Sequence, residues 1–395
     1  MATFTQLLSY LILLGLSTCL LVGCMVSDLI PPQESEPPSK TIMITSETYQ
    51  SQFALPAPLY YLGDGQVWRL SPDAQTKQQI TSESAPVEAF DVSPVDGSLA
   101  YISNNSLIIV RPGDGDRKVL RVGPELTPPR DEVAHLNDIE YITSAIRTPL
   151  WSPDGRKIAF IENGLQIYDF ERSHTEHLWG QSNPSNERII LDSLLSWSPN
   201  GQYFLVSQYT TPMKSVNQIK LGVIKPGAFL YDLDQTNSAT FAWNPEATLL
   251  FLANASFGYP ESLLRCDLGN IQCTMIAEFE PARWYYHYAY PFVTAENRLM
   301  VFMGATNDDS QAPETFKLIS LNLDGSDRRN LRSDGYNLAS ALWSPNGDGV
   351  LIALAQDTDT FQTGTLLWLS TSDQAAISLP VKDGNNFRWD LSLEQ

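Results

Sequence analysis

The protein has 395 residues, 43% of them hydrophobic and 10% aromatic, and its 45 acidic side chains outnumber 25 basic ones to give a formal net charge of −20. A body this acidic repels phosphate groups, so we expect it to bind neither nucleic acid nor an anionic lipid surface. The length suits two average domains, but one repeat pattern accounts for nearly all of the chain.

The first 23 residues carry an export signal. Residues Leu7–Gly23 are uncharged and apolar, and they lead into Leu21-Val-Gly-Cys24. This ending resembles the lipobox of bacterial lipoproteins, which implies a signal peptide of residues 1–23 and acylation of Cys24. The alternative is an uncleaved membrane anchor, because the apolar stretch is almost long enough to span a bilayer. Both interpretations place the body outside the cytoplasm, in the periplasm or on the cell surface, and we favour the lipoprotein.

Residues 24–56 are predicted to form a flexible tether. They include Pro31-Pro-Gln-Glu-Ser-Glu-Pro-Pro38, which is polar, rich in proline and too poor in apolar residues to build a core. The tether leaves residues 57–395 for the folded body.

Two cysteines, Cys266 and Cys273, would remain in this body, because Cys19 would leave with the signal peptide and Cys24 would be acylated. The residues between them form a predicted turn, so a disulfide across a hairpin is expected in an oxidising compartment. The alternative is two unlinked thiols. We expect no metal site here, since no further Cys or His pair lies nearby in the sequence.

The body repeats one short phrase that contains tryptophan. Copies begin at Trp151 (Trp-Ser-Pro-Asp-Gly), Trp197, Trp243 and Trp343, and the first three lie 46 residues apart. Degenerate copies place Val92 and Phe292 in the tryptophan position. A repeat of this length with short strands on both sides favours the four-stranded blade of a β-propeller.

Each phrase predicts the turn of a β-hairpin. Proline sets φ at the start of the turn, Asp or Asn tolerates the bend, and Gly takes the left-handed position. The tryptophan before the turn offers a large apolar surface that we expect to pack between neighbouring blades.

The two ends of the body complement each other. Residues 59–62, 66–70 and 77–80 read as the second, third and fourth strands of a blade, whereas residues 386–392 read as a first strand with nothing after it. Pairing them would close the ring and cover both strand edges. The sequence therefore predicts an all-β, seven-bladed propeller, with six blades as the alternative if a degenerate copy is misread.

The repeat phrase, followed by Ile158-Ala-Phe160 and later by Leu323-Asp-Gly-Ser326, resembles the WD-like propeller repeats of TolB and its relatives. The similarity covers most of residues 57–395 and implies the propeller fold without fixing one function. TolB carries an α/β domain before its propeller, where we expect only the tether in this chain. Similar repeats also form the propeller of prolyl-oligopeptidase-type enzymes, whose hydrolase domain this chain does not contain.

Catalytic signals are weak. The four histidines, His135, His174, His177 and His287, are scattered, and no known nucleophile, zinc or phosphate-binding motif appears. We therefore predict no catalytic residue, no metal and no cofactor.

Two segments could bind a ligand. In the first, Trp284, Tyr286, Tyr288 and Tyr290 would share one side of a strand and present aromatic rings with polar tips. The alternative for these four is packing between blades. The second segment is an insertion at about residues 123–148.

Together these features predict a tethered, extracytoplasmic, monomeric scaffold that binds a protein or peptide of the cell envelope. The alternative is a polysaccharide lyase or hydrolase that uses the central funnel of the ring, and the scattered histidines argue against it.

Overall fold

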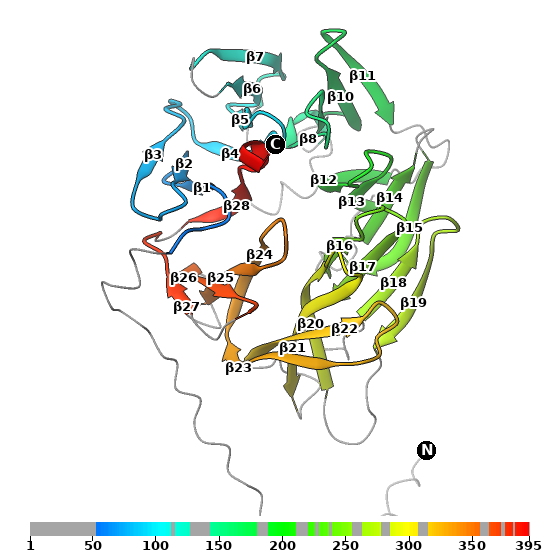
Figure 1. The fold of residues 1–395 in the computed structure, drawn as a ribbon. Coiled ribbons are helices and arrows are strands. Elements are labelled where there is room, and N and C mark those ends of the chain that lie inside the picture. The colour runs from blue at the N-terminus through cyan, green and yellow to red at the C-terminus, as the bar shows by residue number, and fades with distance from the viewer. Residues whose placement is uncertain are drawn as a thin grey trace, which may run out of the picture. The chain divides into compact units, whose positions relative to one another are not determined.

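In the computed structural model of the protein, the described residues are 53–111, 115–126, 143–179, 189–210, 220–225, 229–236, 239–254, 263–277, 285–306, 315–355, 363–372, 376–381 and 384–394. They form seven antiparallel sheets of four strands each, arranged in a ring (Figure 1). This confirms the seven-bladed β-propeller, and the six-bladed alternative was wrong.

Blade 1 joins the two ends of the body: β28 (Asn385–Trp389), β1 (Leu59–Gly63), β2 (Gln66–Leu70) and β3 (Lys77–Gln79). Blade 2 contains β4 (Val87–Val92), β5 (Leu99–Ser103), β6 (Ser106–Val110) and β7 (Arg117–Val122). Blade 3 contains β8 (Arg147–Trp151), β9 (Lys157–Ile161), β10 (Leu165–Asp169) and β11 (His174–Trp179). Blade 4 contains β12 (Ile189–Trp197), β13 (Phe204–Thr210), β14 (Lys220–Lys225) and β15 (Phe229–Thr236).

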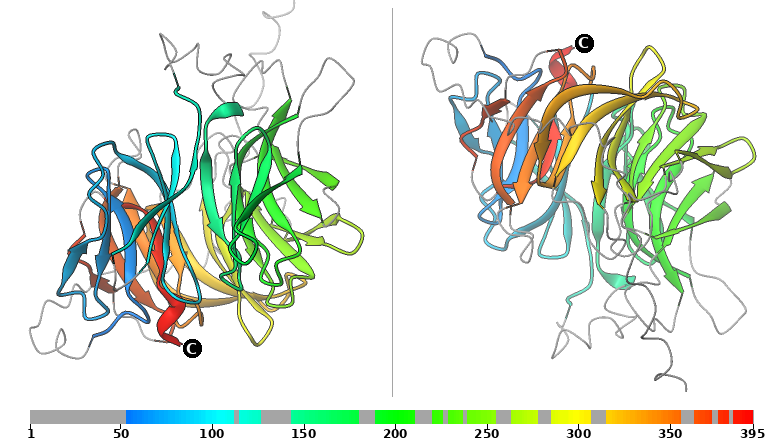
Figure 2. Two further views of the ribbon diagram at one scale, coloured as in Figure 1. Left: turned by 90° about the horizontal axis from the view of Figure 1, so that it is seen from above. Right: turned by 90° about the horizontal axis from the view of Figure 1, so that it is seen from below.

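Blade 5 contains β16 (Ala239–Trp243), β17 (Leu249–Asn254), β18 (Leu263–Asp267) and β19 (Gln272–Ala277). Blade 6 contains β20 (Tyr285–Val293), β21 (Arg298–Thr306), β22 (Phe316–Asn322) and β23 (Arg329–Tyr336). Blade 7 contains β24 (Leu338–Trp343), β25 (Gly349–Ala355), β26 (Thr363–Ser370) and β27 (Ala376–Ser378). A short 3-10 helix, Leu391–Glu394, follows β28 and extends beyond the strands on one side of the ring (Figure 2).

Strands near the middle of a blade are apolar at successive positions because both faces of each sheet are covered. In β25, Val350 and Ile352 pack against blade 6, whereas Leu351 and Ala353 pack against blade 1. Side chains of a strand alternate between its faces, so a continuous apolar run supplies two interfaces at once. The buried apolar residues accordingly form seven clusters, one at each contact between neighbouring blades.

The repeat phrases form the first hairpin turn of their blades, as predicted. In blade 3, Gly155 N donates to Ser152 O at 2.9 Å, and Gly155 has a φ of 66°. A β-carbon at Gly155 would lie 2.9 Å from Cγ2 of Val95 in the turn of blade 2, so neighbouring turns touch. Glycine therefore serves both the conformation of the turn and its close approach to the next one.

The tryptophans lie between blades. Trp151 and Trp343 are 7% and 9% exposed and belong to the clusters of blades 2 and 3 and of blades 6 and 7. Phe292, which replaces tryptophan in blade 6, stacks on the ring of Trp343 at a centroid distance of 5.3 Å. Val92 of the other degenerate copy is buried between blades 1 and 2. Both degenerate copies thus belong to complete blades.

The C-terminal strand closes the ring, as the sequence predicted. Trp389 of β28 pairs with Leu59 of β1, and Arg388 pairs with Tyr60. The Arg388 guanidinium donates to Oδ1 of Asp91 in β4 at 3.2 Å, while Oδ2 of Asp91 accepts from the backbone N of Trp151 at 2.7 Å. Asp91 therefore links blades 1, 2 and 3. Burial raises the pKa of Asp91, and the charge of Arg388 and the hydrogen bond from Trp151 oppose this shift.

The structure bears on two further predictions, the extent of the tether and the insertion after blade 2. Leu55, in the segment predicted as tether, is 3% exposed, and its N donates to Pro72 O at 2.7 Å. Residues 53–56 thus pack on blade 1, because an apolar side chain there fills the cluster between blades 1 and 7. Most of the insertion lies outside the described residues, which stop at 126 and resume at 143.

Replacement of Arg388 tests whether β28 closes the ring. We expect Arg388→Met to lower the free energy of unfolding by about 1–3 kcal/mol, because the buried carboxyl group of Asp91 would lose its cationic partner. Urea unfolding followed by tryptophan fluorescence measures the change. Arg329→Met is the control, since Arg329 and Asp327 form an ion pair with side chains 65% and 40% exposed, and its effect should stay below about 1 kcal/mol. Equal losses in the two variants would contradict a closing role for Arg388.

Candidate functional site

The first hairpin turns of blades 2 to 7 lie on one face of the ring, which we call the turn face. The innermost strands run in the same direction, so their following turns, including the repeat phrases, meet at this face. The C-terminal helix follows β28, the innermost strand of blade 1, and occupies the corresponding position there.

Three hollows lie next to one another on the turn face. The first, of about 570 Å³ between blades 1 and 2, is lined by Tyr60, Arg69, Asp96, Arg111, Asp390 and Ser392 among others. The second, of about 410 Å³ between blades 2 and 3, is lined by Asp96, Arg111, Trp151, Arg156, Phe170 and Glu171 among others. The third, of about 390 Å³ between blades 3 and 4, includes Pro153, Lys157, Trp197, Pro199 and Asn200.

The hollows follow one another along an arc. The first two share Asp96 and Arg111, and the second and third meet at the turn of blade 3, which supplies Trp151 to one and Pro153 to the other. We call this surface the turn-face arc. Its lining combines aromatic rings, guanidinium groups, prolines and carboxylates, a mixture common at protein recognition surfaces.

The floor of the second hollow is aromatic and fixed in place. The rings of Trp151 and Phe170 are stacked with centroids 5.2 Å apart, and Tyr168 meets Phe170 edge-on at 5.0 Å. Phe170 N donates to Arg156 O at 3.1 Å, which ties the outer turn of blade 3 to its repeat phrase. The apolar base of the hollow is therefore part of the packed core.

Carboxylates of the first hollow are held by neighbouring groups. Asp390 is 4% exposed, accepts from the Ser392 hydroxyl at 2.6 Å and lies 3.7 Å from the Arg69 guanidinium. Asp96 accepts from N and Oγ of Ser98 at 3.0 and 2.9 Å. Burial alone would raise the pKa of Asp96, but hydrogen bonds from Ser93 and Ser98 outweigh it and hold that pKa below its usual value.

The predicted aromatic binding residues lie at blade interfaces. Trp284 lies outside the described residues. Tyr288 is 3% exposed and, with half-buried Tyr286, packs between blades 5 and 6. The Arg328 guanidinium lies 5.6 Å from the centroid of the Tyr286 ring. For Tyr286 and Tyr288 these positions favour the packing alternative over an exposed ligand-binding row.

Tyr290 corrects the prediction that the four aromatic residues share one side. It packs on the opposite side of β20, between blades 6 and 7. Its φ of 52° and a register shift between Ala289 and Phe292 turn the strand over at this point. The Tyr290 N donates to Thr240 Oγ1 of blade 5 at 2.6 Å, and its hydroxyl donates to Ala339 O of blade 7 at 2.9 Å.

Of the three described histidines, two lie on an outer strand and the third lies in blade 6. His174 and His177 are exposed on β11, His287 is 3% exposed in β20, and His135 lies outside the described residues. In the described part of the chain, no group of three or more His, Cys, Asp or Glu residues is placed to hold a metal ion.

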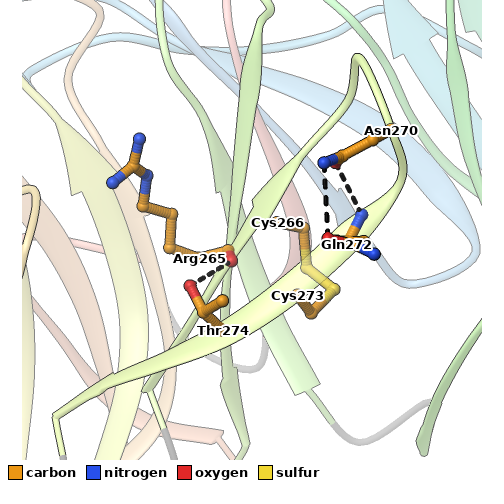
Figure 3. The surroundings of a disulfide bond; sticks show 6 residues. All are labelled: Arg265, Cys266, Asn270, Gln272, Cys273 and Thr274. Atoms are coloured by element: carbon orange, nitrogen blue, oxygen red, sulfur yellow. Dashed lines mark hydrogen bonds between the residues drawn. A yellow bond between two sulfur atoms is a disulfide. The ribbon is translucent and has the colours of Figure 1, made fainter.

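Cys266 and Cys273 form a disulfide that joins β18 to β19 (Figure 3). Cys266 is fully buried in the cluster between blades 4 and 5, and the bond closes the exposed turn that contains Asn270. Cys24, the predicted acylation site, lies outside the described residues. Across the segments that the structure describes, no helix is long and apolar enough to cross a membrane.

Sequence reasoning did not single out the turn-face arc. Its residues come from the repeat phrases and from the outer turns of three successive blades, which the sequence presents only as turn signals. A usable signal was present in Arg111 and Arg156, two basic residues at turns of an acidic chain.

Comparison with known proteins shows similarity of fold alone. No protein-family model matches the chain, and no curated protein matches its sequence. A puromycin hydrolase S511A mutant complexed with PGG aligns with a TM-score of 0.54 at 12% identity, over 84% of this chain and 53% of that one. Dipeptidyl peptidase 4 of Porphyromonas gingivalis aligns with a TM-score of 0.50 at 11% identity, over 80% of this chain and 48% of that one.

TolB from Acinetobacter baumannii aligns with a TM-score of 0.41 at 15% identity, over 82% of this chain and 78% of that one. The chain spans about half the length of the puromycin hydrolase and dipeptidyl peptidase structures that it matches. The alignments with the puromycin hydrolase and the dipeptidyl peptidase agree with the propeller fold expected from the repeat phrase.

The burial of the tyrosine hydroxyls can be tested by measuring stability at alkaline pH. Burial raises the pKa of Tyr60, Tyr290 and Tyr336 to about 12, above the value of about 10 in an unfolded chain. Between these values the unfolded chain loses phenolic protons that the native state retains, so the free energy of unfolding should fall as pH rises from about 10 to about 12. Urea unfolding across this range should show a shallower fall in Tyr290→Phe than in the wild type. Identical slopes would contradict the assigned burial of the Tyr290 hydroxyl.

Proposed function

We propose that the protein is a membrane-tethered, extracytoplasmic β-propeller lipoprotein that binds a protein or peptide partner of the cell envelope through its turn-face arc. The observation that carries the proposal is the succession of three neighbouring hollows across blades 1 to 4. An extended segment of a partner could follow this path and contact each hollow in turn.

The arc is built on turns that are already fixed before a partner arrives. Ser152 Oγ donates to Asp154 Oδ1 at 2.6 Å in the turn of blade 3, and Ser198 Oγ donates to Asn200 Oδ1 at 2.8 Å in that of blade 4. A preformed surface loses little conformational entropy on binding, so more of the contact energy remains as affinity. Arg111 and Arg156 add exposed guanidiniums, which are frequent in the residues that dominate binding energy.

Two features support a location outside the cytoplasm. The lipobox-like segment ending at Cys24 is the expected site of membrane attachment. The Cys266–Cys273 disulfide is of a kind that forms and persists in oxidising compartments. The tether predicted between Cys24 and the propeller would leave the turn-face arc accessible to other envelope proteins.

Acylation is tested at Cys24. In metabolic labelling with a clickable fatty acid, we expect the wild type and Cys19→Ser to be labelled and to sediment with membranes. Cys24→Ser should lose the label, because the lipid is expected to be attached to the Cys24 thiol group. An unlabelled wild type would contradict lipidation, and an unlabelled protein that stays in the membrane would favour the uncleaved anchor.

Partner binding is tested by blocking the arc. Gln78→Cys and Glu171→Cys place a thiol at exposed positions in the first and second hollows, where maleimide-linked polyethylene glycol can be attached. Arg328→Cys, exposed on blade 6, is the control. The full-length proteins serve as bait for solubilised membranes, and bound proteins are identified by mass spectrometry.

We expect a partner captured by the unmodified protein and by modified Arg328→Cys to be lost from both modified arc variants, because the polymer fills the path of the bound segment. Equal capture by all modified proteins would place the binding surface elsewhere. Failure of the unmodified protein to enrich any envelope protein would count against the scaffold function itself.

A further inference from the structure

The second hollow of the turn-face arc has an excess of hydrogen-bond donors. Arg111 and Arg156 both line it, both are exposed, and neither lies within ion-pair distance of a carboxylate among the described residues. Trp151 also lines the hollow, and its buried indole Nε1 has no acceptor within the described part of the chain. Each of these groups donates hydrogen bonds and accepts none.

Other blades satisfy the equivalent indole. Trp243 Nε1 donates to Ser196 Oγ at 3.0 Å, Trp343 Nε1 donates to Tyr290 O at 2.8 Å, and Trp389 Nε1 donates to Trp343 O at 2.7 Å. In every case the acceptor belongs to the preceding blade. Trp151 and Trp197 lack such an acceptor, and these two line hollows of the arc. The arc therefore coincides with the part of the ring where this interaction is missing.

Arg111 and Arg156 are two of the five described arginines that have no carboxylate oxygen within 4.0 Å, the others being Arg172, Arg265 and Arg328. Eight of the described arginines have a carboxylate oxygen within 4.0 Å, as expected where acidic residues greatly outnumber basic ones. Arg111 and Arg156 come from different blades, and they line the same hollow without such a partner. The charge of Arg111 helps to lower the pKa of Asp96, and that of Arg156 helps to lower the pKa of Asp154, but both guanidiniums remain exposed to a ligand.

Two of the nearby carboxylates accept hydrogen bonds from residues of their own turns. Asp96 accepts two hydrogen bonds from Ser98, and Asp154 accepts from Ser152 Oγ at 2.6 Å and from the backbone N of Arg156 at 3.1 Å. Glu171 is exposed at the edge of the hollow. None of the three is within ion-pair distance of Arg111 or Arg156.

We propose that this hollow recognises an acidic peptide segment, with an Asp or Glu carboxylate held between the guanidiniums of Arg111 and Arg156. Guanidinium groups bind carboxylates through paired, charge-assisted hydrogen bonds, which fit a planar acceptor group. An apolar side chain next to the acidic one would contact Ile109 and Phe170 in the same hollow. This inference rests on the proposed function, because it names the chemistry of the partner at the same surface.

A peptide fits this surface better than an anionic polysaccharide. Ile109, Trp151 and Phe170 give the hollow an apolar portion next to its charges, which suits alternating acidic and apolar side chains. The arc continues past the hollow on both sides, so neighbouring residues of an extended peptide would have contacts as well.

The test is selection from a phage-displayed library of random peptides on the immobilised full-length protein. We expect the enriched peptides to contain more Asp and Glu than the starting library. The excess should disappear with Arg111→Gln/Arg156→Gln and persist with Arg328→Gln/Arg172→Gln, which removes the same charge at exposed arginines that do not line the arc. Equal thermal midpoints of the two variants would exclude loss of folding as the cause.

An enriched peptide is then synthesised with Glu or Gln at its acidic position and titrated by fluorescence anisotropy. Replacement of the carboxylate should weaken binding by about tenfold or more, and removal of both guanidiniums should weaken the acidic peptide to a similar extent. Binding of the Glu peptide should also fall as salt is added, since the charges are exposed.

Several outcomes would overturn the inference. These are no enriched peptides, enrichment without an acidic excess, or an acidic excess that survives the loss of both arginines. Stronger competition by polygalacturonate than by acidic peptides would replace the peptide with an anionic polysaccharide. A partner captured in the arc-blocking experiment by a surface that does not need Arg111 and Arg156 would leave the proposed function standing and remove only this refinement.

Discussion

The structure depends on the pairing of β28 with β1, because a propeller blade is stable only when both of its faces are covered. Leu59 and Trp389 pair across the two ends of the folded body, and the resulting blade 1 separates blade 7 from blade 2. Without β28, the cluster between blades 7 and 1 would lose Phe387 and Trp389, and Asp91 would lose Arg388. Closing so long a loop costs conformational entropy, which the buried area of two interfaces offsets.

The same constraint decides where polar groups can lie. Strands that supply two apolar interfaces have little room for charge, so charged side chains collect at turns and strand ends. Arg332 is an exception: it is 1% exposed between blades 6 and 7, where it donates to Ser370 O at 2.9 Å and to Asp334 Oδ2 at 3.0 Å. Burial would raise the pKa of Asp334, but hydrogen bonds from Tyr336 and Arg332 outweigh it and lower that pKa. A buried charge is retained here only with its partners in place.

The turn face shows how one sequence phrase serves both stability and recognition. Within Trp151-Ser-Pro-Asp-Gly155, the tryptophan packs beneath the turn and Ser152 fixes its shape, whereas Pro153 and Asp154 are exposed. Because neighbouring turns touch, their exposed residues make one surface across several blades. The proposed binding site therefore needs no segment added to the propeller.

Much of the fold was readable from the sequence because its signals are local. Alternating and continuous apolar runs mark strands, and the phrases at Trp151, Trp197, Trp243 and Trp343 mark hairpins, so the number of blades and the closing strand could be predicted. Cys266 and Cys273 were also predicted as a pair, since their separation corresponds to a tight turn.

The candidate site was not readable in this way. Tyr290 changes sides because its strand is turned over at Ala289–Phe292 and its backbone N bonds to Thr240 of another blade. Likewise, Arg111 and Arg156 line one hollow only because consecutive blades bring the end of β6 beside the turn before β9. The sequence by itself determined the strands and their turns, because these follow from residues near one another in the chain. It also determined the closure of the ring, because its two ends read as complementary parts of one blade. Only the tertiary structure decided which side chains meet between blades, because that depends on how separate sheets pack.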